Sequence, residues 1–422
     1  MQNFKKISNQ AFKSFFVLLS VLACLPCMPY LQADLQISLQ GGLQAKALVS
    51  GSVGLSSICE SRENQAQEKQ AKGQEKQQAQ EHSKEQAQKD AQPSNEVLAN
   101  QTQNLQKIAQ DRFQEVQRLF ENLRVSIISS AKQDAKTPIN LANQNQTQNL
   151  SFVDFIFQIA DTNILLLGEK HDEKSHHKAQ LLIMQALDAY FAWQVGECKR
   201  FALVLEMLGS EAQSHIDEAS KSKKQIQKEN LKTALGWGKW DYQQYRDIVE
   251  YAFYAPNFDI IAGNLSRQEI STIYKGAEPI AGNVSTSAEV KERISKIISK
   301  SHKTNDATLL ERLTQVQQYK DRRMADMLLK SHDFALLLAG NYHITKTFGI
   351  PLHIEDFLAL GVREENTLDK NATSPKEVAN IGKTPKTLSV GMLKAKYLTS
   401  KRYFKKYGAQ ILSQYDYILL FR

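Results

Sequence analysis

The stretches ILLLGEKH at residues 164–171 and ALLLAGNYH at residues 335–343 decide the fold prediction. Each begins with an apolar run, passes through a glycine and reaches a histidine three positions after that glycine. A short apolar run that ends in glycine is typical of a buried strand. Glycine permits a tight exit from the strand, so His171 and His343 leave their strands in the same way. The repeat therefore predicts two strands that deliver histidine to one edge of a sheet.

Two further apolar runs have the same character, FALVL at 201–205 and IIA at 260–262, and helix-like patterns follow each of them. Strands that are apolar on both faces and alternate with helices are typical of a parallel sheet covered on both sides. The predicted fold class is therefore α/β, a mostly parallel sheet flanked by helices. A smaller all-helical domain is expected to be inserted at about 208–256 and 267–333, and strands at 388–392 and 417–421 are expected to complete the sheet.

Polar residues follow these strands, where ligands of parallel sheets usually bind. A histidine there can ligate iron or zinc, or transfer a proton near neutral pH. His176 and His177 are expected in the first turn of a helix that runs to Leu187, as an exposed and solvated pair without the spacing of zinc proteases. The residues expected to meet at a common rim are Glu169, His171, Glu206, Asn264, Arg267 and His343.

The composition excludes several classes of protein. With 422 residues, 42% hydrophobic and 23% charged, the chain resembles neither a polytopic membrane protein nor a wholly disordered one. Four cysteines are too few for a disulfide scaffold. The net charge of +8 weakly favours anionic partners. No phosphate-binding glycine loop, nucleophile elbow or nucleic-acid module is present, so kinase, serine hydrolase and nucleic-acid-binding functions are disfavoured.

The N-terminal region predicts export. Residues 1–33 are expected to be a signal peptide, because lysines precede an apolar run too short to span a membrane as a mature helix. The run ends in VLAC at 21–24, which resembles a lipobox and predicts lipidation of Cys24; the alternative is an ordinary signal cut after Ala33. The expected location is the periplasm or the outer membrane. Residues 34–95 are expected to be a disordered tether rich in Gln, Glu and Lys.

Helical spacing of apolar residues predicts an amphipathic helix from Val97 to about Ile127, within a region of helix and loop at 96–150. Ser151 is expected to cap a short helix that runs through Ile159. An aromatic cluster at 237–254 is expected to form helix core, with a wall for a cofactor as the second interpretation.

The strand-end motifs occur in an ordered series, GEKHD at 168–172, LEM at 205–207, AGNLSR at 262–267 and AGNYH at 339–343. This series resembles the ChaN-like haem-binding lipoproteins from about 152 to 421. The resemblance implies an α/β domain at 151–422 that binds haem non-covalently and takes part in bacterial haem or iron uptake. The residues expected at the rim are then expected to bind this cofactor, namely Glu169, His171, Glu206, Asn264, Arg267 and His343. The resemblance also implies a possible homodimer and a possible membrane haem receptor. Tyr342 within the second histidine motif, and the long Gln and Glu rich insertion, depart from the family pattern.

Tyr274 is the tyrosine expected to ligate haem iron, since a tyrosinate is a hard anionic ligand suited to the ferric ion. Ser266 is expected to cap its helix and Gly276 to end it, and the stretch around Tyr274 also resembles the family. The alternative is a tyrosine packed on its own domain. The resemblance further implies that His302 contacts a haem held by a neighbouring subunit; a solvated histidine is the alternative.

Two other functions remain open at this point. The first is a metal-dependent hydrolase of the related Tiki and erythromycin-esterase superfamily, using Glu169, His171, Glu206 and His343. The second is a scaffold adaptor that uses the tether and a basic surface near the C-terminus. Asp321, beside Arg322 and Arg323, is expected to form ion pairs or to meet haem propionates.

Overall fold

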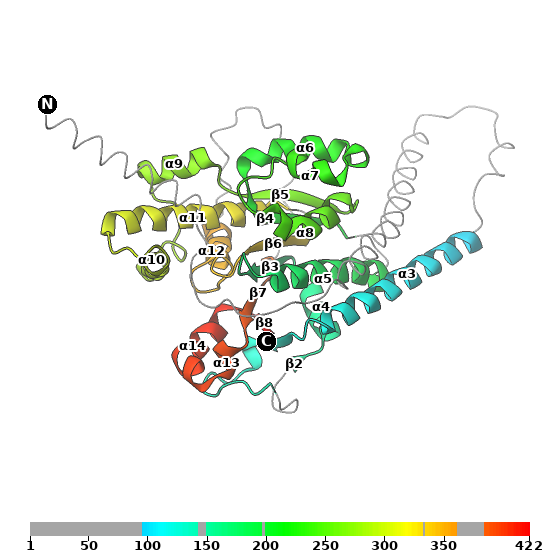
Figure 1. The fold of residues 1–422 in the computed structure, drawn as a ribbon, viewed down its shortest axis with the longest axis horizontal. Coiled ribbons are helices and arrows are strands. Elements are labelled where there is room, and N and C mark those ends of the chain that lie inside the picture. The colour runs from blue at the N-terminus through cyan, green and yellow to red at the C-terminus, as the bar shows by residue number, and fades with distance from the viewer. Residues whose placement is uncertain (1–94, 142–148, 196–198, 332–333, 361–383) are drawn as a thin grey trace.

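An eight-stranded sheet forms the centre of the computed structural model, which describes residues 95–141, 149–195, 199–331, 334–360 and 384–422 (Figure 1). The strand order is β2-β1-β8-β7-β3-β6-β4-β5. The predicted signal peptide, the lipidation of Cys24 and the tether lie outside the described residues. The strands are β1 Ser126–Ser129, β2 Asn149–Leu150, β3 Ile164–Glu169, β4 Phe201–Gly209, β5 Phe258–Asn264, β6 Phe334–Gly340, β7 Thr387–Lys394 and β8 Tyr417–Phe421.

The strands β3 to β8 run parallel to one another, and β1 is antiparallel to both β2 and β8. The two strands of the repeated motif, β3 and β6, are adjacent in the sheet. Glu169 at the end of β3 pairs with Gly340 at the end of β6. The predicted α/β class, with a mostly parallel sheet flanked by helices, is confirmed.

Helices cover both faces of the sheet, because successive residues of each strand point to opposite sides. Leu165 and Leu167 pack with α3, α4, α5 and α8 on one face, and Leu166 packs with α11, α12 and α14 on the other. The helices are α3 Asn95–Glu121, α4 Phe152–Ala160, α5 Lys174–Tyr190, α6 Gln213–Lys221, α7 Lys228–Ala234, α8 Tyr242–Tyr254, α9 Arg267–Gly276, α10 Ala288–His302, α11 Ala307–Leu329, α12 Ile350–Leu360, α13 Lys396–Thr399 and α14 Lys401–Gln414.

The first described helix is shorter than the sequence predicts. Helix α3 ends at Glu121, and Ile127 lies in β1, where it pairs with Leu419 of β8. Arg124 adopts a positive φ of 54°, in the left-handed region, which stops the helical path. The β-branched pair that follows then joins the edge of the sheet. The apolar residues of β1 happen to continue the helical spacing of α3, so the sequence pattern did not reveal the end of the helix.

The predicted helix starts are confirmed. The Ser151 hydroxyl accepts the Asp154 N–H at the start of α4. Ser266 and Glu269 form a capping box at the start of α9, and Gly276 ends that helix with φ +125°. The aromatic cluster at 237–254 packs in the core, as expected. Among the described helices, none combines the length and apolar character that crossing a membrane requires.

Candidate functional site

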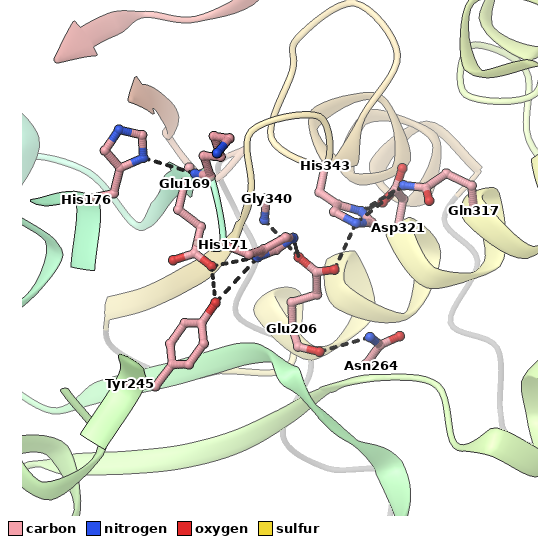
Figure 2. Close-up of polar contacts among 12 residues, drawn as sticks. Glu169, His171, His176, Glu206, Tyr245, Asn264, Gln317, Asp321, Gly340 and His343 are labelled. Atoms are coloured by element: carbon pink, nitrogen blue, oxygen red, sulfur yellow. Dashed lines mark hydrogen bonds and ion pairs between the residues drawn. The ribbon is translucent and has the colours of Figure 1, made fainter. Parts of the chain in front are cut away.

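The carboxyl ends of four parallel strands bring charged side chains to one rim (Figure 2). Glu169 is the last residue of β3, Glu206 lies in β4 and Asn264 ends β5. His171 and His343 follow β3 and β6. The strand ends meet because β3, β6, β4 and β5 are consecutive neighbours in the sheet. The repeated sequence motif therefore places its two histidines around the same carboxylate, Glu206.

These side chains form a chain of alternating carboxylates and imidazoles. His171 Nδ1 lies 2.7 Å from Glu169 Oε1, and His171 Nε2 lies 3.9 Å from Glu206 Oε2. The other oxygen of Glu206 is 3.1 Å from His343 Nε2. His343 Nδ1 in turn contacts the carboxylate of Asp321, which projects from α11. We call Glu169, His171, Glu206, His343 and Asp321 the rim cluster.

Gly340 allows the rim cluster to close. Its N–H donates a hydrogen bond of 2.8 Å to Glu206 Oε2. A Cβ at this position would lie 2.9 Å from His171 Nε2, closer than side-chain atoms normally approach. Asn264 supports the same strand, because its side-chain amide donates to the Glu206 carbonyl at 2.9 Å. Glycine at 340 is therefore needed for the approach of His171 to Glu206.

The two glutamates of the rim cluster are held in the anionic form. Burial alone would raise the pKa of Glu169, but the hydrogen bond with His171 and the close approach of His177 outweigh it and hold the pKa at about 2. Burial also acts against the charge of Glu206, and His343 and His171 together lower its pKa well below the usual range. Buried carboxylates of this kind are stable only because imidazoles compensate them.

The pKa values of the two imidazoles of the rim cluster are raised, whereas those of the two glutamates are lowered. Burial alone would lower the pKa of His343, but Glu206 and Asp321 outweigh it and raise the pKa to about 10. His343 is therefore a buried imidazolium at neutral pH, and both of its ring nitrogens face carboxylates. The pKa of His171 is also raised, against the effect of burial, chiefly by Glu206 and then by Glu169. Burial raises the pKa of Asp321 despite its contact with His343.

His171 is the member of the rim cluster that reaches solvent. Its side chain is 17% exposed, whereas that of Glu206 is 5% and that of Asp321 is 2%. The half-buried ring of Trp240 packs against His171, with 4.5 Å between the ring centroids. A molecule that approaches the rim would therefore contact His171 and Trp240 before it contacts the other residues of the rim cluster.

Three contributors to the site come from helices and were not predicted as site residues. Tyr245 of α8, expected to be core, donates its hydroxyl to Glu169 Oε1 at 2.5 Å. Its ring is buried as expected, and only the polar tip enters the site. Asp321 was expected in ion pairs or with propionates, and it pairs with His343. His177 Nε2 lies 3.1 Å from Glu169 Oε2, although the orientation is not that of a hydrogen bond.

The prediction that His176 and His177 are exposed is wrong. Both side chains are buried, with exposed fractions of 2% and 4%. His176 Nδ1 accepts the Lys170 N–H at 3.0 Å, and burial lowers the pKa of His176 to about 4. The first turn of α5 faces the sheet here, because β3 leads into this helix through a short turn that folds it back over the strand end.

Tyr274, His302 and Arg267 do not join the rim cluster. Tyr274 is half-buried near the end of α9 and packs with apolar residues of α10 and α11. His302 is exposed at the end of α10, and Arg267 is exposed in the first turn of α9. The structure therefore separates two groups: Glu169, His171, Glu206, Asn264 and His343 at the rim, and Tyr274 with His302 in the layer of α9, α10 and α11.

The histidines and carboxylates of the rim cluster do not form a metal cage. Across the described ranges, no set of three or more His, Cys, Asp and Glu side chains has an arrangement that would hold a metal ion. In particular, His343 has no free ring nitrogen to offer, since each faces a carboxylate. The expected metal-dependent chemistry at Glu169, His171, Glu206 and His343 therefore does not fit this geometry.

Comparison with known proteins shows a strong similarity to the ChaN family. Residues 155–354 match the family model described as haem-binding uptake, Tiki superfamily, ChaN. A solved structure of ChaN from Campylobacter jejuni, described as showing cofacial haem binding, is 35% identical to this chain. The similarity covers 71% of this chain and 97% of that one, with a TM-score of 0.55. No curated protein sequence matches.

Two further solved structures are more distant. One is a mutant erythromycin esterase in its open conformation, with 13% identity, a TM-score of 0.30 and coverage of 59% of this chain and 75% of that chain. The other is a succinoglycan biosynthesis protein, with 12% identity, a TM-score of 0.31 and coverage of 68% and 93%. Similarities at this level carry no argument about function.

Proposed function

The chain belongs to the haem-binding uptake family of ChaN-like proteins in the Tiki superfamily, and from this premise we propose that it binds haem non-covalently and serves bacterial haem or iron uptake. The observation that carries the proposal within this chain is the environment of Tyr274. Haem bound there would supply a ferric iron for the phenol oxygen, and the chain would supply the ligand and the surrounding contacts.

The residues around Tyr274 fit a haem. Among the described residues, its hydroxyl has no hydrogen-bond partner, so the oxygen is available to a ligand. Its ring packs against a buried apolar cluster of α10 and α11, and the partly buried Ile297 and Leu309 at the same cluster offer apolar surface for a porphyrin. The Arg312 guanidinium lies 5.5 Å from the ring centroid, and the exposed Lys275 follows Tyr274 in the chain. These two cations suit propionate carboxylates.

The buried histidine of the rim is poorly suited to act as the axial ligand. A protonated imidazole has no lone pair for iron, and the pKa of about 10 keeps His343 protonated at neutral pH. We therefore assign the axial role to Tyr274. The rim cluster, with Asn264, stabilises the carboxyl edge of the sheet from which α9 begins.

The remaining parts of the proposal concern the cellular setting. A signal peptide within residues 1–33, cut before Cys24 so that this cysteine is lipidated, would place the protein in the periplasm or at the outer membrane. The C. jejuni relative is described with cofacial haems. By analogy, we propose a homodimer in which His302 of one subunit contacts the haem of the other. A membrane haem receptor is the proposed partner in uptake.

Titration of the purified chain with ferric haem tests the proposal. We expect a saturable Soret shift that Tyr274→Phe abolishes or weakens at least tenfold, because phenylalanine keeps the ring and removes the ligand oxygen. Tyr190→Phe is the matched control, since Tyr190 is also half-buried but lies at the end of α5. A normal haem titration in the Tyr274→Phe protein would refute the assignment of the ligand.

A haem-dependent change of mass tests the dimer. Analytical ultracentrifugation is expected to show association when haem is added, and His302→Ala should weaken that association without abolishing haem binding. An unchanged dimer in the His302→Ala protein would remove His302 from the haem site.

A hydrolase is the second candidate, and the rim cluster is the observation that favours it. His171 is solvent-accessible and lies between two buried carboxylates, an arrangement that suits proton transfer to or from a bound molecule. A panel of peptide and ester substrates, compared between the parent and His171→Gln, tests this function. Turnover that survives the His171→Gln substitution would exclude His171 as the acid or base.

A further inference from the structure

Helices α13 and α14 carry an unbalanced positive surface. Residues 384–415 contain no Asp or Glu. The exposed cations of the two helices are Lys396, Lys401, Arg402, Lys405 and Lys406, and we call them the basic surface. Among the described residues, none of the five forms an ion pair, whereas Lys394 just before them pairs with Glu173 at 3.5 Å. The described residues therefore do not neutralise the charge of this surface.

Other charged helices of the protein are balanced internally. On α10, Arg293 pairs with Glu289 at 2.7 Å and Lys296 pairs with Glu292 at 2.6 Å. Such pairs at four-residue spacing stabilise a helix, and α14 has no acidic residue with which to form one. A cluster of unpaired like charges lowers the stability of a helix. The need to form α14 therefore does not explain why these cations are present.

The cations also stand at the unfavourable end of α14. Lys401 and Arg402 occupy its first turn, where the helix dipole is positive and favours anions. Ser400 precedes the helix without giving a side-chain cap, so the first N–H groups of α14 are left for another acceptor. Both features add to the positive potential. The surface is therefore built to attract an anion from outside.

Aromatic residues lie among the cations. Tyr397 and Tyr403 are half-buried, and the Lys396 ammonium lies 5.7 Å from each ring centroid. Tyr407 is half-buried one turn after Tyr403, with Lys406 at 5.0 Å from its ring. Among the described residues, the three phenol hydroxyls have no hydrogen-bond partner. Tyrosine with one apolar side and one polar tip is typical of the headgroup region of a membrane.

The helix is oriented so that this surface faces outward. Phe404, Gly408 and Leu412 form the buried stripe of α14, and Phe404 and Leu412 pack into the core beneath the sheet. On α14, Arg402 and Lys406 lie on the side opposite this stripe, and Lys401 and Lys405 are exposed nearer to it. In Figure 1, α13 and α14 (red) lie together at one corner of the molecule, away from α6 and α7. Within the described structure, the five cations are therefore exposed together at this corner.

We propose that the basic surface of α13 and α14 binds the headgroups of an anionic phospholipid bilayer. Four of the five cations are lysines, which act as hydrated point charges suited to a fluid layer of headgroups. Flexible lysines with interleaved tyrosines fit such a layer better than the bidentate contacts by which proteins read nucleic acids. The proposal does not depend on haem binding, so its failure would leave the haem proposal untouched.

Vesicle sedimentation with the full-length chain tests the proposal. Phosphatidylcholine vesicles with about one third phosphatidylglycerol are compared with pure phosphatidylcholine, which measures the contribution of the apolar residues 15–23. We expect binding to the anionic vesicles that falls as salt is raised. The combined substitutions Lys401→Glu, Arg402→Glu and Lys405→Glu should weaken that binding at least about tenfold, since each basic residue contributes separately.

The matched control reverses three exposed lysines elsewhere, Lys221→Glu, Lys232→Glu and Lys239→Glu, which gives the same net charge. Circular dichroism verifies that both triple variants are folded. Equal loss of binding in the two variants would overturn the proposal, because net charge alone would then explain the result. Tighter binding of the parent to a random oligonucleotide than to the anionic vesicles would also overturn it. Loss confined to the α14 variant supports it.

Discussion

Replacing Glu206 with glutamine tests whether the buried charges of the rim cluster stabilise the fold. Glutamine has the shape of glutamate, so its carbonyl oxygen can keep the hydrogen bond from the Gly340 N–H, now 2.8 Å. Its amide group then faces His343 Nε2, which is 3.1 Å from the present carboxylate oxygen. The amide donates, so the ring nitrogen has to accept. We therefore expect His343 to be neutral in the Glu206→Gln protein, with a pKa well below that of the parent.

The size of the effect follows from the pKa of His343. Its rise from 6.5 to about 10 corresponds to a stabilisation of about 5 kcal/mol. The charge of Glu206 is the largest single effect that raises this pKa. We therefore expect Glu206→Gln to lower the free energy of unfolding by about 3 kcal/mol near pH 6, within the range for breaking a buried ion pair.

The pH dependence gives a second, independent readout. Because the folded-state pKa of His343 is raised, its contribution to stability is complete below about pH 6.5 and is lost as the pH rises through about 10. Urea unfolding of the parent, followed by circular dichroism, should show a free energy of unfolding that decreases over this range. The slope should be much flatter in the Glu206→Gln protein.

The control is Glu289→Gln on α10, which removes an exposed carboxylate paired with Arg293 and should change little. If Glu206→Gln unfolds with the parent's free energy near pH 6 and keeps the parent's slope above neutral pH, the reasoning about His343 is refuted.

Three further predictions concern single groups. Tyr245→Phe removes the hydrogen bond to buried Glu169 and should lower the free energy of unfolding by about 2 kcal/mol, measured by urea unfolding against Tyr190→Phe; an unchanged value contradicts the assigned bond. Because the pKa of Glu169 is lowered to about 2, its contribution is present above about pH 4.5 and is lost as the pH falls towards 2. Acid unfolding of Glu169→Gln should lack that part of the pH dependence, and an acid transition identical to the parent's would argue against it. Ser266→Ala removes the capping box of α9 and should cost about 1 kcal/mol, seen as a lower thermal midpoint than that of Ser413→Ala, whose serine is exposed on α14. Equal midpoints for these two variants would contradict the role of the cap.

The strand ends were predictable because their signals are local. An apolar run followed by glycine and a polar residue is complete within eight or nine positions, and it gave Glu169, His171 and His343 the correct edge of the sheet. The closeness of these residues then follows from the sheet itself, because adjacent parallel strands have their carboxyl ends at the same edge. The residues at the ends of β3 and β6 could therefore be placed together without knowing how the helices pack.

The helical contributors were not predictable in the same way, because they depend on how each helix is rotated against the sheet. Asp321 stands next to Arg322 and Arg323 in a charged run that would ordinarily face water, and only the packing of α11 turns it towards His343. His177 was predicted to be exposed because the residues around it in the sequence do not indicate that its ring packs against Glu169. Tyr245 was correctly expected in the core, but a buried ring gives no indication of where its hydroxyl points.

The place of β6 in the sheet governs when this protein can fold. It is the bridge between β3, β7 and β8 on one side and β4 with β5 on the other, yet it comes after all of β3, β4 and β5 in the chain. In a polypeptide that is made or translocated from its N-terminus, β3 therefore has no paired neighbour and β4 is paired only with β5, with open edges, until residue 340 has emerged. Truncated chains that end before residue 340 lack β6, and we expect them to be degraded by proteases or bound by chaperones.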